Sequence, residues 1–90
     1  MSELSQYTTD TTDIDATGRK YFCGLFVSET GNSTARVTVR NGSASGTIVF
    51  DRRLTAYGNA DVIPTETVQF PDGIFVKVES GAVRATLLTC

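Results

Sequence analysis

Hydrophobic and polar side chains alternate with a period of two along much of the chain. The segment 35–40, ARVTVR, places Ala35, Val37 and Val39 on one face and polar side chains on the other. The segment 74–79, IFVKVE, repeats this alternation. Successive side chains of a β-strand point to opposite faces of the sheet, so the pattern predicts strands with one buried face.

Further strand-like segments recur at short intervals, separated by the turn-forming stretches TGNS, NGSASG, PDG and SGA. We predict strands at residues 20–29, 47–50, 67–70 and 83–90, with an edge strand at 61–63. In the segment 47–50 we expect Ile48 and Phe50 to point inward. No segment has a helical period. The chain is therefore predicted to be all-β, either a small antiparallel β-sandwich or a jelly-roll-like barrel.

Residues 1–19 differ from the rest of the chain. They are rich in Thr, Ser and Asp, and their few apolar side chains keep no period. Such a segment buries too little apolar surface to offset the entropy lost on ordering. We therefore predict one β-sandwich domain at residues 20–90, preceded by a polar N-terminal arm at 1–19 that is flexible or ordered by a partner.

Several apolar side chains fall on faces that the alternation assigns to water. If Ile74 and Val76 point to the core, Phe75 points away from it, and Leu88 is outward in the last strand by the same reasoning. A lone small sandwich needs one apolar face per sheet. We therefore expect a second molecule to cover these side chains, although the polar arm could also fold back over them.

The first predicted strand is apolar on both faces. Tyr21, Cys23, Leu25 and Val27 alternate with Phe22 and Phe26. We predict that either Phe22 or Phe26 joins Phe75 and Leu88 in a contact between subunits of a homo-oligomer.

The charged residues exclude two classes of partner. The formal net charge is −2, from eight basic and ten acidic residues. No basic face is available for nucleic acid, and no polybasic segment for an anionic membrane. No apolar run is long enough to cross a bilayer. The N-terminus also lacks the features of a signal peptide, which predicts synthesis in a cytoplasm without a secretory step.

The densest charge cluster is DRR at residues 51–53. Its arginines could bind a phosphate or a partner's carboxylate, because a guanidinium presents a planar fork of donors. They could equally be a strand end that faces water. We include Arg52 and Arg53 among the interface candidates. An alternative ligand-binding site would use Arg52 with Tyr57 and Asn59 from the following loop.

Catalytic chemistry is not indicated. The chain has no histidine, which removes the Ser–His and Cys–His nucleophile pairs and most zinc sites. Asp10, Asp13 and Asp15 lack the Gly and the closing Glu of a calcium loop. We predict that the protein is not an enzyme and holds no cofactor or metal. We interpret Cys23 and Cys90 as reduced thiols that serve as small apolar residues, with a bridge between them as the alternative.

The segments YFCGLFVSET, VTVRNG, VQFPDGIFVKVESG and VRATLLTC, within Tyr21 to Cys90, resemble small structural proteins of tailed-bacteriophage virions. The resemblance implies a non-enzymatic capsid decoration, or cement, protein. It implies a homo-oligomer, such as the trimer that decoration proteins often form, with the major capsid protein or another virion protein as partner. It also implies the virion as location and a terminal arm that grips neighbouring capsomers. The alternative is a tail or spike-base component, or a module that binds a host surface or carbohydrate.

Overall fold

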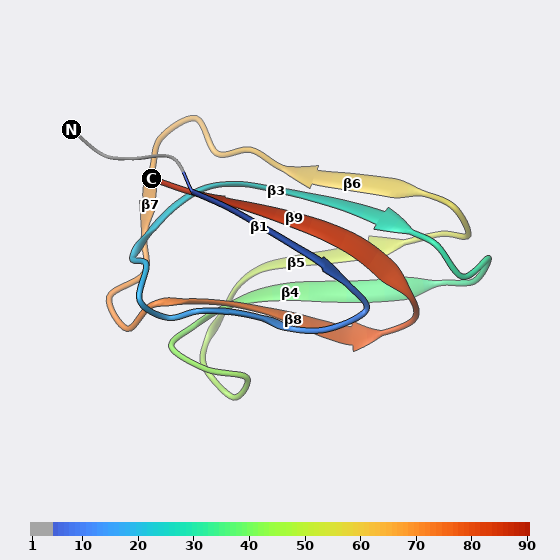
Figure 1. The fold of residues 1–90 in the computed structure, drawn as a ribbon, viewed down its shortest axis with the longest axis horizontal. Helices are drawn as coiled ribbons and strands as arrows, with labels where there is room; N and C mark the ends of the chain where they lie inside the picture. The colour runs from blue at the N-terminus through green and yellow to red at the C-terminus, as the bar shows by residue number, and fades with distance from the viewer. Residues whose placement is uncertain (1–4) are drawn as a thin grey trace.

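Two antiparallel sheets packed face to face form the structure, a computed structural model that describes residues 5–90 (Figure 1). The larger sheet contains, in spatial order, β1 (Ser5–Asp10), β9 (Val83–Thr89), β3 (Tyr21–Glu29) and β6 (Asn59–Val62), and β7 (Val68–Gln69) also pairs with β3. The smaller sheet contains β2 (Ile14–Ala16), β8 (Ile74–Ser80), β4 (Ala35–Asn41) and β5 (Ile48–Leu54). The prediction of an all-β sandwich is confirmed.

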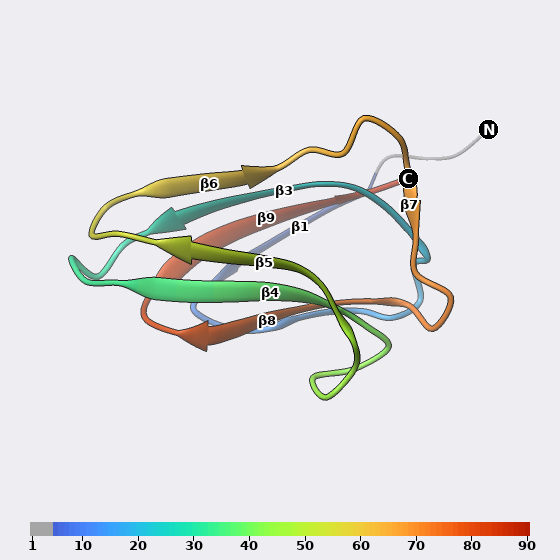
Figure 2. The same cartoon turned by 180° about the vertical axis from the view of Figure 1, so that it is seen from behind.

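Residues 5–16 belong to the sandwich. Strand β1 pairs with β9 from Ser5 opposite Thr89 to Asp10 opposite Arg84, and β2 pairs with β8. Figure 2 shows the molecule from behind, with β1 beside β9 in the larger sheet and β8 beside β4 in the smaller one. The predicted division at residue 20 therefore does not separate an arm from the domain. The first four residues of that predicted arm lie outside the described residues.

The pattern did not reveal these two strands because they contribute few side chains to the core. Ile14 and Ala16 are buried, but Asp15 between them is exposed, and three residues are too few to establish a period. Strand β1 is held mainly by its ladder with β9, and its Thr residues are well suited to an extended backbone.

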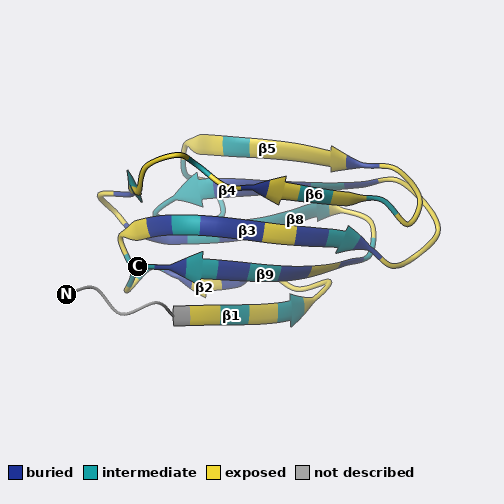
Figure 3. Cartoon of the chain, turned by 90° about the horizontal axis from the view of Figure 1, so that it is seen from above, coloured by how far each residue is buried: buried dark blue, intermediate teal, exposed yellow. Residues whose placement is uncertain are grey.

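The core is centred on aromatic and branched side chains from both sheets. The ring of Phe22 lies 5.1 Å from that of Phe50 and 5.8 Å from that of Phe70, measured between centroids. Figure 3 shows the buried positions concentrated along β3 and β9, whereas β5 at the edge is exposed along most of its length. Burial of each large apolar side chain contributes roughly 1.5–3 kcal/mol to stability.

Two β-bulges change which side chains point inward. In β3 the register against β9 shifts between Phe22 and Gly24, and in β4 the register against β5 shifts between Val39 and Arg40. An extra residue in one strand reverses the alternation beyond it. Phe22 is consequently 0% exposed. Ile48 lies opposite Arg40 and is 39% exposed, so the prediction that Ile48 points inward is wrong.

The turn at Gly81 carries the chain from the smaller sheet to the larger one, between β8 and β9. Gly81 has φ +80°, a conformation that glycine adopts without steric cost. A Cβ at this position would lie 2.6 Å from the carbonyl oxygen of Thr34. The turn therefore packs closely on the start of β4, at the end of the sandwich opposite the disulfide described below.

Candidate functional site

The outer face of the larger sheet carries an exposed apolar centre. Phe26, at the middle of this face, is 39% exposed. Its cross-strand neighbours are Thr86 of β9 on one side and Asp61 of β6 on the other. Leu88 is half-buried one row away, where it lies opposite Gly24. A Cβ on Gly24 would be 3.8 Å from Leu88 Cδ1, so the leucine side chain lies over the glycine. We call this surface the Phe26 face; it consists of Gln6, Thr8, Asp10, Gly24, Phe26, Ser28, Asn59, Asp61, Arg84, Thr86 and Leu88.

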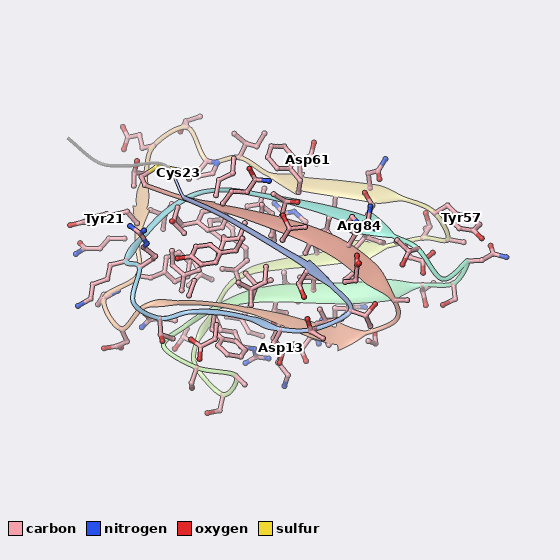
Figure 4. The ribbon with its side chains drawn as sticks, in the orientation of Figure 1. Asp13, Tyr21, Cys23, Tyr57, Asp61 and Arg84 are labelled. Atoms are coloured by element: carbon pink, nitrogen blue, oxygen red, sulfur yellow. A yellow bond between two sulfur atoms is a disulfide. The ribbon has the colours of Figure 1, made fainter. Side chains whose placement is uncertain are left out.

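Charges on the Phe26 face are few and lie at its margins. Asp10 pairs with Arg84 at 2.9 Å, and both side chains are about two-thirds exposed. Asp61 lies on the edge strand β6, and Figure 4 shows Asp61 and Arg84 on different strands of the sheet. Threonine, serine, glutamine and glycine occupy most of the remaining positions. The centre of this face is therefore apolar and uncharged.

The outer face of the smaller sheet is built differently. Arg36 donates two hydrogen bonds to Asp51, at 3.1 and 2.8 Å. Arg40 contacts Glu79 at 2.6 Å, and Lys77 lies 3.6 Å from the same carboxylate. We call the set Arg36, Thr38, Arg40, Asp51, Lys77 and Glu79 the charge network.

A buried threonine connects the charge network to the sheet. The Thr38 hydroxyl donates to Glu79 at 3.0 Å and accepts from Arg40 Nε at 3.2 Å. Thr38 is 0% exposed although it points away from the core, because the charged side chains cover it. The hydrogen bond from Arg40 lowers the pKa of the Glu79 carboxyl, and the one from Arg36 lowers that of Asp51. The side chains of the charge network therefore find their hydrogen-bond or ion-pair partners within the same chain.

Glu29 is a buried carboxylate at the end of β3. It is 3% exposed and accepts backbone N–H bonds from Tyr57 at 2.9 Å, Gly31 at 2.7 Å and Ser33 at 3.3 Å. The hydrogen bond from Tyr57, foremost, lowers the pKa of this carboxyl. Glu29 thus ties the β3–β4 loop to the β5–β6 loop. The sequence analysis missed this role, and the only sequence signal for it is an acidic residue at the end of a strand, before a turn.

Cys23 and Cys90 form a disulfide that joins the bulge of β3 to the end of the chain, with their Cα atoms 5.9 Å apart. The interpretation of both residues as reduced thiols is therefore wrong. The sequence could not show that the bulge would bring Cys23 beside Cys90. Figure 4 places Cys23 and Tyr21 at one end of the sandwich and Tyr57 at the other.

The predicted interface residues do not form one surface. Phe26 and Leu88 share the Phe26 face, but Phe22 is wholly buried, so its prediction as an interface residue is wrong. Phe75 lies on the opposite outer face and is half-buried. Both predicted arginines are exposed on β5. Arg53 lies opposite Arg36 on the outer face, whereas Arg52 lies opposite the inward-facing Val37.

Two other groups of residues considered from sequence are also separated. Tyr57 is 66% exposed in a loop and, like Thr11 and Asn32, has a positive φ, while Asn59 and Arg52 lie on different strands. Asp10 pairs with Arg84, whereas Asp13 accepts from the N–H of Val78. Within residues 5–90 no group of three or more potential ligands could hold a metal ion, and no helix could span a bilayer.

Two solved structures share this fold. PirA superposes with a TM-score of 0.57 at 10% identity, covering 98% of this chain and 94% of its own. A structure from Bacillus endospore appendages, described as a family of disulfide-linked pili, has a TM-score of 0.55 at 18% identity, covering 97% and 86%. No protein-family model and no curated protein matches the sequence. At these identities the likeness concerns the fold alone.

These comparisons correct the resemblance to tailed-phage virion proteins, which is wrong. The matching structures are PirA and an endospore appendage, and neither is a virion component. These neighbours also contradict the capsid-decoration function with its tail and carbohydrate-binding alternatives, the capsid partner and the virion location, and we abandon them. Strand alternation and a PDG turn are general properties of small sandwiches, which is why they misidentified the family.

Proposed function

We propose that this protein is a non-enzymatic structural subunit that associates with copies of itself through the Phe26 face. The observation that carries this proposal is the exposed Phe26 beside Leu88, at the centre of a face whose charges lie at its margins. Exposed apolar patches rimmed by polar residues mark interaction sites. Aromatic residues are enriched and charges depleted at the centres of protein interfaces.

The endospore appendage supports an assembling role, because that protein of similar fold is described as a pilus. It is also described as disulfide-linked, and this chain differs in a defined way. Both cysteines of the sequence are used in the bond between Cys23 and Cys90 within one chain. Contacts between copies of this protein would therefore be non-covalent.

The disulfide also bears on where the protein works. Disulfides persist in oxidising environments and are rare in a reducing cytoplasm. We therefore propose that the folded subunit functions outside the reducing cytoplasm.

Sedimentation velocity over a wide range of protein concentrations tests the self-association. The wild-type protein should form oligomers as the concentration rises, and Phe26→Ser should weaken association. Only the 39% of Phe26 that is still exposed can become buried on association. This burial is worth roughly 0.6–1.2 kcal/mol of the roughly 1.5–3 kcal/mol for a whole Phe, or about threefold to eightfold in the association constant for each copy. Tyr57→Asn is the matched control: it removes an exposed aromatic ring far from the Phe26 face, and Asn tolerates the positive φ of that position.

The proposal fails if the wild-type protein remains monomeric at every concentration. It also fails if Phe26→Ser associates as strongly as the wild type, or if Tyr57→Asn weakens association as much as Phe26→Ser does.

A further inference from the structure

A cavity of about 480 Å³ opens where β4 begins and β5 and β8 end, on the smaller sheet and away from the Phe26 face. Its volume falls within the range of small-molecule sites. Ala35 and Leu54 are among its lining residues but are only 3% and 4% exposed. Two arginines, Arg36 and Arg53, and three hydroxyl-bearing residues, Thr34, Thr55 and Ser80, complete the lining.

The walls of this cavity are held in place by contacts already described. Glu29 binds backbone N–H groups of both loops that flank it, at Ser33 and Tyr57, next to the lining residues Thr34 and Thr55. Gly81 packs against Thr34 and Ala35 beside the lining residue Ser80. A site fixed before binding loses less entropy when a ligand enters.

The two arginines of the cavity differ in their partners. Arg36 uses Nε and Nη2 to bind Asp51, which fixes its guanidinium and leaves Nη1 unused in that pair. Arg53 has no ion-pair partner among residues 5–90. A guanidinium presents five N–H donors in a planar fork that matches a carboxylate. Arg53 can therefore bind an anion with its whole fork, and Arg36 can add one further donor.

The surrounding charges favour an anionic ligand. The outer faces of β4, β5 and β8 carry four cations, Arg36, Arg40, Arg53 and Lys77, against two carboxylates, Asp51 and Glu79. This region is positive in a protein whose net charge is −2.

We infer that this cavity binds a carboxylate group. The carboxylate receives the fork of Arg53 and the Nη1 donor of Arg36. The hydroxyls of Thr34, Thr55 and Ser80 supply orienting hydrogen bonds. A free small molecule or an acidic side chain of a second copy could present this group, and the experiment below separates the two sources.

Titration of the ¹⁵N-labelled protein with N-acetylglycine, followed by NMR, tests the inference. Saturable shifts should appear at the amides of Thr34, Thr55 and Ser80. The neutral analogue N-acetylglycinamide should give no saturable shift there. Inorganic phosphate at a pH where it is a dianion should bind more weakly than N-acetylglycine.

The neighbouring arginines provide matched variants. Arg53→Ala should weaken N-acetylglycine binding about tenfold or more, because hydrogen bonds to charged groups are lost. Arg53→Lys, which keeps the charge but not the fork, should fall between Arg53→Ala and the wild type. Arg52→Ala removes an equally exposed arginine from the other face of the same strand and should leave binding unchanged.

The inference is overturned if no saturable shift occurs in the wild type, if the neutral analogue binds as well, or if Arg52→Ala weakens binding as much as Arg53→Ala. A dilution series without ligand identifies the source. Shifts of the same amides with protein concentration, reversed by N-acetylglycine, indicate a carboxylate from a second copy, whereas concentration-independent shifts indicate a free ligand. Because Phe26→Ser leaves the cavity intact, loss of self-association in that variant with retained N-acetylglycine binding would separate this site from the proposed function.

Discussion

The two outer faces of the sandwich have the same alternating backbone pattern but treat their outward side chains in opposite ways. On the smaller sheet, Thr38 is 0% exposed because paired Arg, Lys, Asp and Glu side chains cover it. On the larger sheet, Phe26 is 39% exposed, and the ion pair between Asp10 and Arg84 lies at the margin of the face. The charged side chains of the smaller sheet pair with one another, whereas the larger sheet leaves an apolar centre exposed to solvent.

Phe75 and Phe26 both point outward, but their cross-strand neighbours differ. Phe75 lies in register between Arg40 and Asp15 on the smaller sheet and is half-buried. Phe26 lies in register between Asp61 and Thr86, whose side chains are short. Long charged side chains can cover apolar surface with their methylene stems, and short ones cannot. An outward phenylalanine therefore indicates an interface only when its cross-strand neighbours leave it uncovered.

The largest expected effect on stability distinguishes Phe22 from Phe26, which lie on opposite faces of the same strand. Phe22→Ala should lower the free energy of unfolding by about 3–5 kcal/mol, the usual cost of a cavity in an aromatic core. Phe26→Ala should lower it by only about 1–2 kcal/mol, since 39% of Phe26 is already exposed to water. Urea unfolding of both variants, at concentrations where the protein is monomeric, measures the difference. Similar losses in the two variants would show that the assignment of the faces of β3 is wrong.

The same pair of residues shows how far the sequence could be interpreted. Alternation identified the strands at 35–40 and 74–79, and it identified Leu88 and Phe75 as outward. It did not separate Phe22 from Phe26, because the bulge at Cys23 is a property of the ladder between β3 and β9. It also could not distinguish Phe75 from Phe26, because cross-strand neighbours depend on register, which a single strand does not encode.

The ends of the sandwich were harder to predict than its strands. The cavity lining comes from three strand ends that are distant in the sequence, at residues 34–36, 53–55 and 80. The disulfide has a sequence separation of 67 and depends on the same bulge. The charges at 51–53 were recognised as a candidate site. Only the pairing of β5 with β4 shows that Arg53 lies opposite Arg36 on the outer face whereas Arg52 lies opposite Val37.

A smaller effect should distinguish the ion pairs on the two faces. Glu79→Ala leaves Arg40 and the buried Thr38 hydroxyl without their shared acceptor, and should cost about 1–3 kcal/mol of stability. Asp10→Ala removes a carboxylate that is 68% exposed, and should leave the unfolding midpoint unchanged within error. Thermal or urea unfolding of the two variants measures both effects. If Asp10→Ala proved as destabilising as Glu79→Ala, the charge network would stabilise the fold no more than the exposed pair of Asp10 and Arg84 does.

Acid should reveal the charge network with a still smaller effect. The hydrogen bond from Arg40 lowers the pKa of Glu79 in the folded state below its usual value of 4.5. A group with a depressed folded pKa stabilises the protein above its unfolded pKa, and this contribution is lost as the pH falls through the folded value. The melting temperature should therefore fall below about pH 4.5, with Asp51 and Glu29 contributing in the same direction. Glu79→Gln should fall less steeply than the wild type, and Asp10→Asn, the control on the Phe26 face, should follow the wild type. If Glu79→Gln and the wild type had the same dependence of melting temperature on pH, Glu79 would not contribute to the loss of stability in acid.

The smallest expected effect is that of salt on the association constant, which tests directly whether the apolar or the charged face makes the contact between copies. Exposed charges are screened at high ionic strength, because the Debye length falls from about 10 Å at 0.1 M to about 3 Å at 1 M. Contacts made by burial of Phe26 and Leu88 do not depend on such screening. The association constant from sedimentation should therefore change by less than about threefold when sodium chloride is raised from about 0.1 to 1 M. Contacts made through the charge network would instead weaken roughly tenfold or more over the same range. A large loss in high salt would move the self-association surface from the larger sheet to the smaller one, since the charged face rather than the apolar one would then hold the copies together.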